Sequence, residues 1–492
     1  MQPIFIISII AAYFLMLILI SYFTGKEESN ESFFKANRQS PWYVVAFGMI
    51  GASLSGVTFI SVPGWVEASK FSYMQVVLGY ILGYLVIGTV LLPLYYRLNL
   101  TSIYTYLEQR FGTASYKTGA SFFILSRIVG ASFRLFLVAN VLQIILFDQM
   151  GIPFWVTVTI TIILIWLYTF KSGIKTIVWT DTLQTLFMLI AVGVTLVSIY
   201  DEMNIGATGL LNYVKASPMS QIFFFDDPRS ADYFWNQFFS GAFIAIVMTG
   251  LDQDMMQKNL TCRSLKDAQK NMFWFTIVLT FVNFFFMVMG LLLTDFARQK
   301  GVTAMKDDLF PTLASEHLGT AVFVFFLIGL IAAAYSSADS ALTSLTTSVS
   351  VDILDIEKKY DSKKQIRVRK RIHVILSVIL ILVIITFKYL IKNESVISKL
   401  FTFAGYTYGP LLGMFSFGLF TNLKTRDVLV PVIALASPVL AYFISSWLKS
   451  DFDIDLGFFI LILNGTITFL LLLLNTNGKF DRKSLNTAQY PA

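Results

Sequence analysis

The chain has 492 residues, of which 56% are hydrophobic and only 14% are charged, whereas charged residues make up about 25% of a soluble globular protein. Its 37 basic and 30 acidic side chains are too few to cover the surface of a soluble protein of 55.5 kDa. A soluble enzyme, a nucleic-acid-binding protein and a disordered scaffold are therefore excluded, and the net charge of +7 has to be interpreted through the positions of the basic residues.

Runs of about 20 apolar residues, the length that crosses a bilayer as a helix, recur along the whole chain. They predict thirteen transmembrane helices, at residues 3–23, 42–66, 74–96, 118–147, 152–170, 176–200, 233–251, 271–294, 318–349, 372–391, 396–421, 428–448 and 456–475. We interpret residues 1–492 as a single all-α membrane domain. The first segment lacks the basic start and the small-residue cleavage site of a signal peptide, so we expect it to be a retained span.

The basic residues indicate how the chain lies in the membrane. The loops after the first, third, fifth, seventh, ninth and eleventh segments, together with the C-terminal tail, hold 25 of the 37 Lys and Arg residues, and the stretch from Lys358 to Arg371 alone has eight. Cytoplasmic loops are the ones enriched in Lys and Arg. We therefore expect a multi-pass protein of the plasma (inner) membrane, with its N-terminus outside and its C-terminus in the cytoplasm.

Cysteine and histidine are scarce. Cys262 is the single cysteine, and the two histidines, His317 and His373, are far apart in the sequence. This composition argues against a zinc or haem site and against catalysis by a Cys-His or Ser-His pair. We expect no organic cofactor and no enzymatic activity.

The second span is interrupted by small and polar residues, which include Gly48, Gly51, Ser53, Ser55 and Gly56. An unwound helix near 51–56 would expose backbone carbonyls, which a membrane tolerates only where they line a cavity. Five spans later, residues 234–251 contain two further Gly-containing interruptions. This spacing indicates two inverted five-helix repeats with a substrate site between them, although the same glycines are equally typical of tight helix packing.

Four ionisable side chains lie well inside the predicted spans: Arg127, Arg134, Asp181 and Asp339. Each costs about 2.5–3.5 kcal/mol at the centre of a membrane helix, so such residues are functional candidates that need a partner. Asp181 also has a simpler interpretation, as a carboxylate favoured near a helix N-terminus.

Asp339 lies on a helix rich in small residues and hydroxyls. Ser336, Ser340, Thr343 and Thr347 recur at spacings of four, three and four, which places them on one face. Hydroxyl and carboxylate oxygens beside a closely packed helix favour coordination of Na⁺. The alternative is small-residue packing in which the hydroxyls bond to their own helix.

Three stretches together resemble the sodium:solute symporter family. They are Ser172 to Gln184, which is similar to the family's Gly-Gly…Trp-Thr-Asp…Gln motif, Asp252 to Lys258, similar to Asp-Gln-x-x-x-Gln-Arg, and Ala332 to Ser340, similar to Ala-Ala…Ser-Ser. The resemblance implies the LeuT-type fold. One extra helix would lie at 3–23, the two five-helix repeats at 42–200 and 233–421, two extra helices at 428–475, and a short cytoplasmic tail at 476–492.

The resemblance also implies a sodium site between the first and eighth core helices. Its ligands would be the carbonyls of Gly51, Leu54 and Ala333 and the hydroxyls of Ser336 and Ser337. A second cation site, similar to that of sialic acid transporters, would use Asp181, Ser336 and Ser340. Asp339 stands where those transporters have Ser, so it is a cation ligand, a proton acceptor or a salt-bridge partner, and the stoichiometry of one or two Na⁺ stays open.

For the substrate, the resemblance points to Ser53, Ser55 and Thr58 on the first core helix and to Gln75 on the next one. The arginine that sialic acid transporters direct at a carboxylate aligns with Gly130, and Arg127 and Arg134 flank that position. Either arginine could hold an anionic substrate or pair with Asp339 or Asp181. Tyr406 and Tyr408 lie where the family has an outer gate, although most aromatic residues in such a chain are lipid-facing or core.

We therefore expect a Na⁺-coupled symporter that imports a small polar solute by alternating access and functions as a monomer in the lipid bilayer. A sugar, a sugar acid such as sialic acid, or another carboxylate is the expected solute, and the two arginines favour an anionic or polyhydroxylated one. An amino-acid (proline-like) or vitamin symporter is the alternative. A membrane-embedded enzyme and a transport-inactive sensor are more remote, because the chain has neither a cluster of catalytic groups nor a soluble signalling domain.

Overall fold

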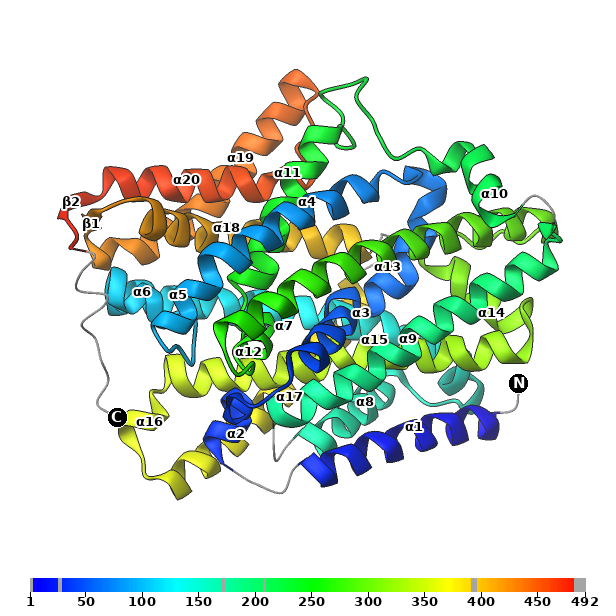
Figure 1. Cartoon of the computed structure of the whole chain (residues 1–492), viewed down its shortest axis with the longest axis horizontal. Helices are drawn as coiled ribbons and strands as arrows, with labels where there is room; N and C mark the ends of the chain where they lie inside the picture. The colour runs from blue at the N-terminus through cyan, green and yellow to red at the C-terminus, as the bar shows by residue number, and fades with distance from the viewer. Residues whose placement is uncertain (1–2, 25–28, 170–172, 207–208, 391–395, 482–492) are drawn as a thin grey trace.

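A computed structural model describes residues 3–24, 29–169, 173–206, 209–390 and 396–481 (Figure 1). The end of the predicted tail, 482–492, lies outside these residues. The first half contains helices α1 (Pro3–Thr24), α2 (Asn30–Lys35), α3 (Trp42–Ser69), α4 (Tyr73–Val86), α5 (Leu92–Arg97), α6 (Thr105–Arg110), α7 (Thr113–Leu142), α8 (Phe154–Thr169), α9 (Ile174–Glu202) and α10 (Leu210–Ala216). A π-helical turn, η2 (Ile87–Leu91), joins α4 to α5.

The second half is also helical. It contains α11 (Phe234–Ala245), α12 (Gln253–Asn259), α13 (Leu265–Lys300), α14 (Leu309–Glu316), α15 (Gly319–Ser348), α16 (Ile356–Lys359), α17 (Ser362–Leu390), α18 (Val396–Phe420), α19 (Val430–Phe452) and α20 (Ile460–Leu474). The π-helical turn η7 (Ile246–Gly250) extends α11. Two short strands, β1 (Leu423–Thr425) and β2 (Thr476–Lys479), pair antiparallel and connect the end of α18 to the end of α20.

Each of the thirteen predicted spans has a helical counterpart, but their number as spans stays a prediction. Among the described residues, ten helical segments are long and apolar enough to cross a membrane, and α11 with α12 forms an eleventh candidate if the bent pair is one span. Helix α8 has 16 residues, whereas a candidate span has at least 18, and α18 is not among the ten. Several spans are longer than predicted, because helices such as α13 continue through polar ends that a hydropathy window leaves out.

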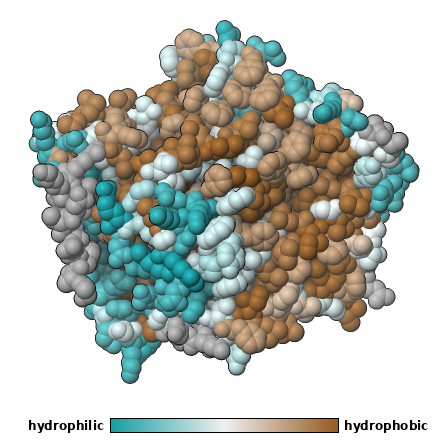
Figure 2. Space-filling view, viewed as in Figure 1, coloured by the Kyte–Doolittle hydropathy of each residue, from teal (hydrophilic) through white to brown (hydrophobic). Residues whose placement is uncertain are grey.

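The helices are arranged around α3. This helix packs against α9, α13 and α15, and most of its residues are buried, whereas α1 lies at the edge of the bundle (Figure 1). Apolar side chains cover much of the face shown in Figure 2, and polar side chains gather at its lower left, where Figure 1 places α2 and α16. This distribution fits an exterior that lies in lipid with a polar end outside it.

Two spans are broken, as the sequence predicts. Helix α3 loses helical geometry at Ser55, whose φ of 35° and ψ of 167° interrupt the hydrogen-bond ladder. The second break separates α11–η7 from α12, which are bent by 69° relative to each other. A positive φ is costly for a residue other than glycine, and the groups released by both breaks need partners inside the protein.

Glycines allow α4 and α11 to cross in close contact. A Cβ atom on Gly79 would lie 2.0 Å from the carbonyl oxygen of Phe238, and one on Gly241 would lie 2.1 Å from the carbonyl oxygen of Val76. Because both obstacles are backbone atoms, a side chain at either position would force the two helices apart.

We expect Gly79→Ala to destabilise the protein by about 1–3 kcal/mol, the usual cost of overpacking, and thermal unfolding of the detergent-purified protein measures this effect. Gly193→Ala is the matched control, because its Cβ would meet nothing within 4 Å and alanine is favoured over glycine in a helix interior by about 1 kcal/mol. Equal melting temperatures for the two variants would show that the crossing of α4 and α11 does not depend on Gly79.

Candidate functional site

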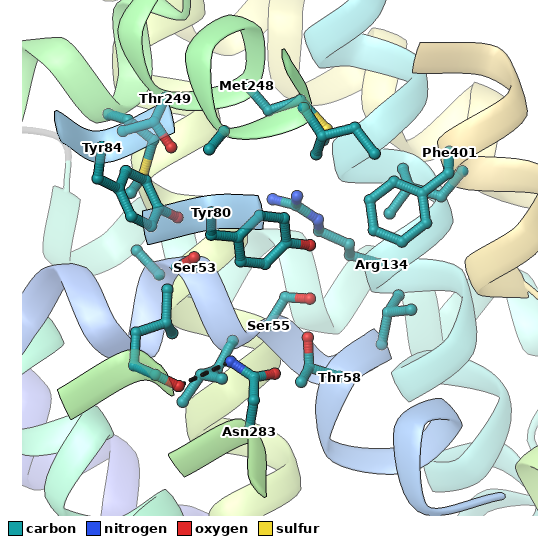
Figure 3. A pocket seen from close by; sticks show the side chains of 18 of the residues that line it. Ser53, Ser55, Thr58, Tyr80, Tyr84, Arg134, Met248, Thr249, Asn283 and Phe401 are labelled. Atoms are coloured by element: carbon teal, nitrogen blue, oxygen red, sulfur yellow. Dashed lines mark hydrogen bonds between the residues drawn. The ribbon is translucent and has the colours of Figure 1, made fainter. Parts of the chain in front are cut away.

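A cavity lies beside the break in α3. Residues of α3, α4, α7, α11, η7, α12, α13 and α18 line it (Figure 3). The lining combines hydroxyls, aromatic rings and two arginines, Arg127 and Arg134. Figure 3 labels Ser53, Ser55, Thr58, Tyr80, Tyr84, Arg134, Met248, Thr249, Asn283 and Phe401. This mixed lining is typical of a site for a small organic molecule.

Three of the four polar residues expected at the substrate line this cavity: Ser53, Ser55 and Thr58. The fourth, Gln75, does not. Its amide nitrogen donates to the Asp232 carbonyl at 3.0 Å, and its oxygen accepts from the amide of Phe224 at 3.1 Å. Gln75 therefore holds the segment before α11.

Sequence reasoning missed the residues of α4 and α13 at the cavity. Tyr73, Tyr80 and Tyr84 line it from α4, and their spacing of seven and four places them on one helical face. Asn283 lines it from α13, where an amide within an apolar span was a usable signal. The three tyrosines of α4 could not be recognised as cavity residues in the sequence, since most aromatic residues in such a chain pack against lipid or the core.

The two arginines of α7 have different surroundings. Arg127 forms an ion pair with Asp254, and its Nη2 lies 3.6 Å from Oδ1 of Asp252. These carboxylates stand at the break between η7 and α12, where Asp252 caps α12 by accepting from the amides of Asp254 and Met255. The predicted pairing of Arg127 with Asp339 or Asp181 is therefore wrong, because the second broken span supplies closer carboxylates.

Arg134 is buried, with 8% of its surface exposed, and it reaches from α7 into the cavity (Figure 3). Among the described residues it has neither an ion-pair partner nor a hydrogen bond, and its Nε is fully enclosed. A buried guanidinium without a counter-charge is costly. The cavity thus contains a guanidinium that has no ion-pair partner among the described residues, and an anion would complement its charge.

The hydroxyls of α15 approach the broken part of α3. Ser337 Oγ lies 3.5 Å from the carbonyl oxygen of Ala52 and 3.3 Å from that of Ala333. The amide of Gly51 donates to Thr185 Oγ1 at 3.0 Å, and a Cβ on Gly51 would lie 2.3 Å from that oxygen. The α3 carbonyl beside Ser337 is thus the carbonyl of Ala52. In the sequence, Ala52 lies between Gly51 and Leu54, whose carbonyls were the predicted ligands.

Ser336 points in another direction, toward a buried cluster of charges. Its Oγ donates to Asp181 Oδ1 at 2.8 Å, and Lys258 Nζ lies 2.7 Å from Asp181 Oδ2. Asp339 accepts from the Tyr168 hydroxyl at 2.8 Å and from the Ser340 amide at 2.5 Å. Lys258 follows the seventh predicted span, so the sequence predicts it in a cytoplasmic loop. The structure instead buries it inside the protein with 1% of its surface exposed.

The two tyrosines of α18 have different contacts. The Tyr408 hydroxyl donates to Asp252, beside Arg127, so it contacts the break between η7 and α12. Tyr406 is half-buried and its ring lies 6.3 Å from that of Tyr442 on α19. Neither side chain lines the cavity, and the role of both residues as a gate stays a prediction.

A helical membrane protein with a mixed polar and aromatic cavity beside a broken span has the architecture of a secondary transporter. The family model described as "Sodium:solute symporter family" matches residues 33–427. The chain belongs to this family and is a Na⁺-coupled, multi-pass membrane transporter.

Known proteins support this assignment. The sodium/sialic acid symporter NanT of Aliivibrio fischeri is 24% identical over 459 residues, which are 89% of this chain and 86% of the relative. The human sodium/iodide cotransporter is 27% identical over 80% of this chain and 62% of the relative. A solved structure described as the substrate-bound, outward-open state of a Na⁺-coupled sialic acid symporter, with a novel Na⁺ site, superimposes with a TM-score of 0.81 at 18% identity, over 96% of this chain and 99% of the other. The fold is the expected LeuT-type fold.

We expect Arg127→Gln to destabilise the protein by about 3–5 kcal/mol, because it leaves the carboxylates of Asp252 and Asp254 buried without their cation. Arg134→Gln is the matched control on the same helix. It removes a charge that has no ion-pair partner among the described residues, so thermal unfolding without solute should be unchanged or shifted upward. A similar loss of stability in both variants would contradict the different roles assigned to the two arginines.

Proposed function

We propose that this symporter carries a small organic anion, a carboxylate of the sugar-acid type such as sialic acid, together with Na⁺. The observation that carries the proposal is the unpaired guanidinium of Arg134 in a cavity that also offers the hydroxyls of Ser53, Ser55 and Thr58. A guanidinium binds a carboxylate through two parallel hydrogen bonds, and hydroxyls and tyrosines suit a polyhydroxylated solute. The named solutes of the two relatives, sialic acid and iodide, are both anions.

For Na⁺, we propose a site between α3 and α15. Ser337 supplies a hydroxyl, and the break at Ser55 releases carbonyls of the preceding turn, including those of Ala52 and Leu54. The Ala333 carbonyl completes the set from α15. Neutral oxygen ligands of this kind suit a hard, weakly held monovalent cation, and they are brought together only when α3 and α15 are close.

This arrangement couples the ion to the solute through α3. The α3 ligands of Na⁺ and the solute-facing hydroxyls belong to the same interrupted stretch of α3, residues 52–58. Na⁺ that joins α3 to α15 would hold the broken segment in the form that binds the solute, and rocking of the two repeats would then open the site to the other side.

The proposed direction of transport is inward, with the N-terminus outside and the C-terminus in the cytoplasm. Lys258, Arg110 and Arg369 of the predicted cytoplasmic side are buried, and the side still has 22 other Lys and Arg residues of the 37 in the chain. A negative membrane potential contributes about 2.3 kcal/mol per charge per 100 mV to Na⁺ entry. We place the protein in the inner membrane as a single transport domain.

Arg134→Gln should weaken binding of the anionic solute by about 10- to 100-fold, the value of a charge-assisted hydrogen bond or pair of bonds. A thermal-shift screen of acidic and neutral solutes, with and without Na⁺, identifies the ligand, and uptake into proteoliposomes measures the affinity. Arg134→Lys keeps the charge but loses the paired geometry, so its affinity should lie between those of wild type and Arg134→Gln. Binding of neutral solutes alone, unaffected by Arg134→Gln, would contradict an anionic substrate and favour the amino-acid or vitamin alternative.

Ser337→Ala should lower the apparent Na⁺ affinity of solute uptake by about tenfold through the loss of one oxygen ligand. Ser344→Ala is the matched control, because Ser344 is buried two turns further along α15 and its hydroxyl bonds to its own helix at Ala341. Uptake that does not depend on Na⁺, or that responds equally to both substitutions, would reject the site between α3 and α15.

A further inference from the structure

A groove opens on the surface of the bundle where α19 begins and α20 ends. Leu429, Val432 and Ile433 line it from the start of α19 and the turn before it, and Leu471 and Leu474 line it from the last turn of α20. None of the described residues that line this groove also lines the transport cavity, and both helices follow residue 427, where the match to the family model ends. The groove therefore belongs to a part of the chain that the proposed transport mechanism does not use.

The walls of the groove are apolar and open toward lipid. Val432 has 62% of its surface exposed and Leu474 has 82%, and both helices are long and apolar enough to cross a membrane. Exposed apolar side chains on such helices lie against acyl chains. Because the groove is at the ends of both spans, it lies at the level where acyl chains meet headgroups. An occupant with an apolar chain and a polar head fits this position.

Arg426 lines the groove at its polar end. Its backbone is fixed against the end of α20, because its amide donates to the Asn475 carbonyl at 3.3 Å and its carbonyl accepts from Asn475 Nδ2 at 3.0 Å. The residue is exposed, and among the described residues its guanidinium has neither an ion-pair partner nor a hydrogen bond. The groove thus combines apolar walls with a cation whose backbone is held in place.

The carboxylate next to Arg426 in the sequence is directed elsewhere. Asp427 accepts from the backbone amides of Ala114 and Ser115 at 2.8 Å each, so it caps the start of α7. The described residues 421–427 and 475–481 contain three basic side chains, Lys424, Arg426 and Lys479, against two acidic ones, Asp427 and Asp481. With Asp427 bound to α7, this end of the groove has an excess of positive charge.

The groove lies at the same end of the bundle as the basic stretch 358–371. Asp427 bonds to the first turn of α7, and Lys117 in the next turn of α7 pairs with Asp355 at 2.9 Å, just before that stretch. Strands β1 and β2 and helix α16 accordingly lie on the same side of the view in Figure 1. In the proposed orientation this is the cytoplasmic end, and the cytoplasmic leaflet is the one with a negative surface potential from anionic lipids.

We propose that this groove binds one anionic phospholipid, with an acyl chain along the apolar walls and the headgroup phosphate on Arg426. A guanidinium binds phosphate oxygens through paired hydrogen bonds. A zwitterionic phospholipid carries the same phosphate, but its ammonium group would add a further positive charge beside Arg426, Lys424 and Lys479. The net charge of the headgroup therefore determines which lipid is preferred. The inference concerns a ligand other than the solute and Na⁺, and it goes beyond the proposed function.

The test measures lipid binding to the purified, delipidated full-length protein by native mass spectrometry. The probes are phosphatidylglycerol, phosphatidylcholine with the same acyl chains, and glycerol phosphate, which has the charged head without the chains. Wild type should bind one phosphatidylglycerol about fivefold more tightly than phosphatidylcholine, the effect of one basic residue beside an anionic headgroup. Arg426→Gln should abolish this preference, whereas Arg426→Lys keeps the charge and should retain most of it.

Two further variants separate the groove from the general charge of this surface. Lys424→Gln is the matched control, because Lys424 is exposed on β1 but does not line the groove, and it should leave the preference unchanged. Val432→Trp fills the groove and should weaken binding of both phospholipids. Equal affinity of wild type for the two phospholipids, an equal effect of Lys424→Gln and Arg426→Gln, or binding of glycerol phosphate as tight as that of phosphatidylglycerol would overturn the inference.

Discussion

The two broken spans are the constraint on which the rest of the structure depends. In a membrane every backbone polar group has to be satisfied within the protein, so a helix that unwinds at mid-membrane requires other helices to pack around the break. The break of α3 at Ser55 releases carbonyls toward α15 and opens space that Arg134 enters from α7. The break after η7 turns α12 inward and delivers both the carboxylates that pair with Arg127 and the ammonium that pairs with Asp181.

The sequence predicted the features that depend on local composition. Small residues from Gly48 to Gly56 marked the break of α3, and the hydroxyl face of α15 marked the contact between α3 and α15. A run of apolar residues predicts a membrane helix in the same way, because every helix that crosses the lipid needs about 20 apolar residues. The family resemblance also predicted which of these segments form the two repeats. No single segment contains that information.

The partner of each buried charge could not be predicted in this way. Lys258 lies only seven residues after Leu251, the predicted end of an apolar span, and a charge there is typical of a loop. Its burial follows from the 69° bend before α12, which is a property of the packed bundle. Gln75 shows the opposite case, since its polar group lies inside a span but bonds to the segment preceding α11 and not to the cavity.

The difference between Arg127 and Arg134 shows how one break defines the chemistry of the whole cavity. The two residues are seven apart on one helix, so their backbones are separated by about 10 Å at 1.5 Å per residue. The carboxylates of Asp252 and Asp254 are fixed at the start of α12 and lie within ion-pair distance of Arg127. They do not lie within that distance of Arg134 among the described contacts, so its charge stays available in the cavity. A straight α11–α12 span would not turn this capped helix start inward, and the positive charge at the cavity depends on that geometry as much as on the arginine itself.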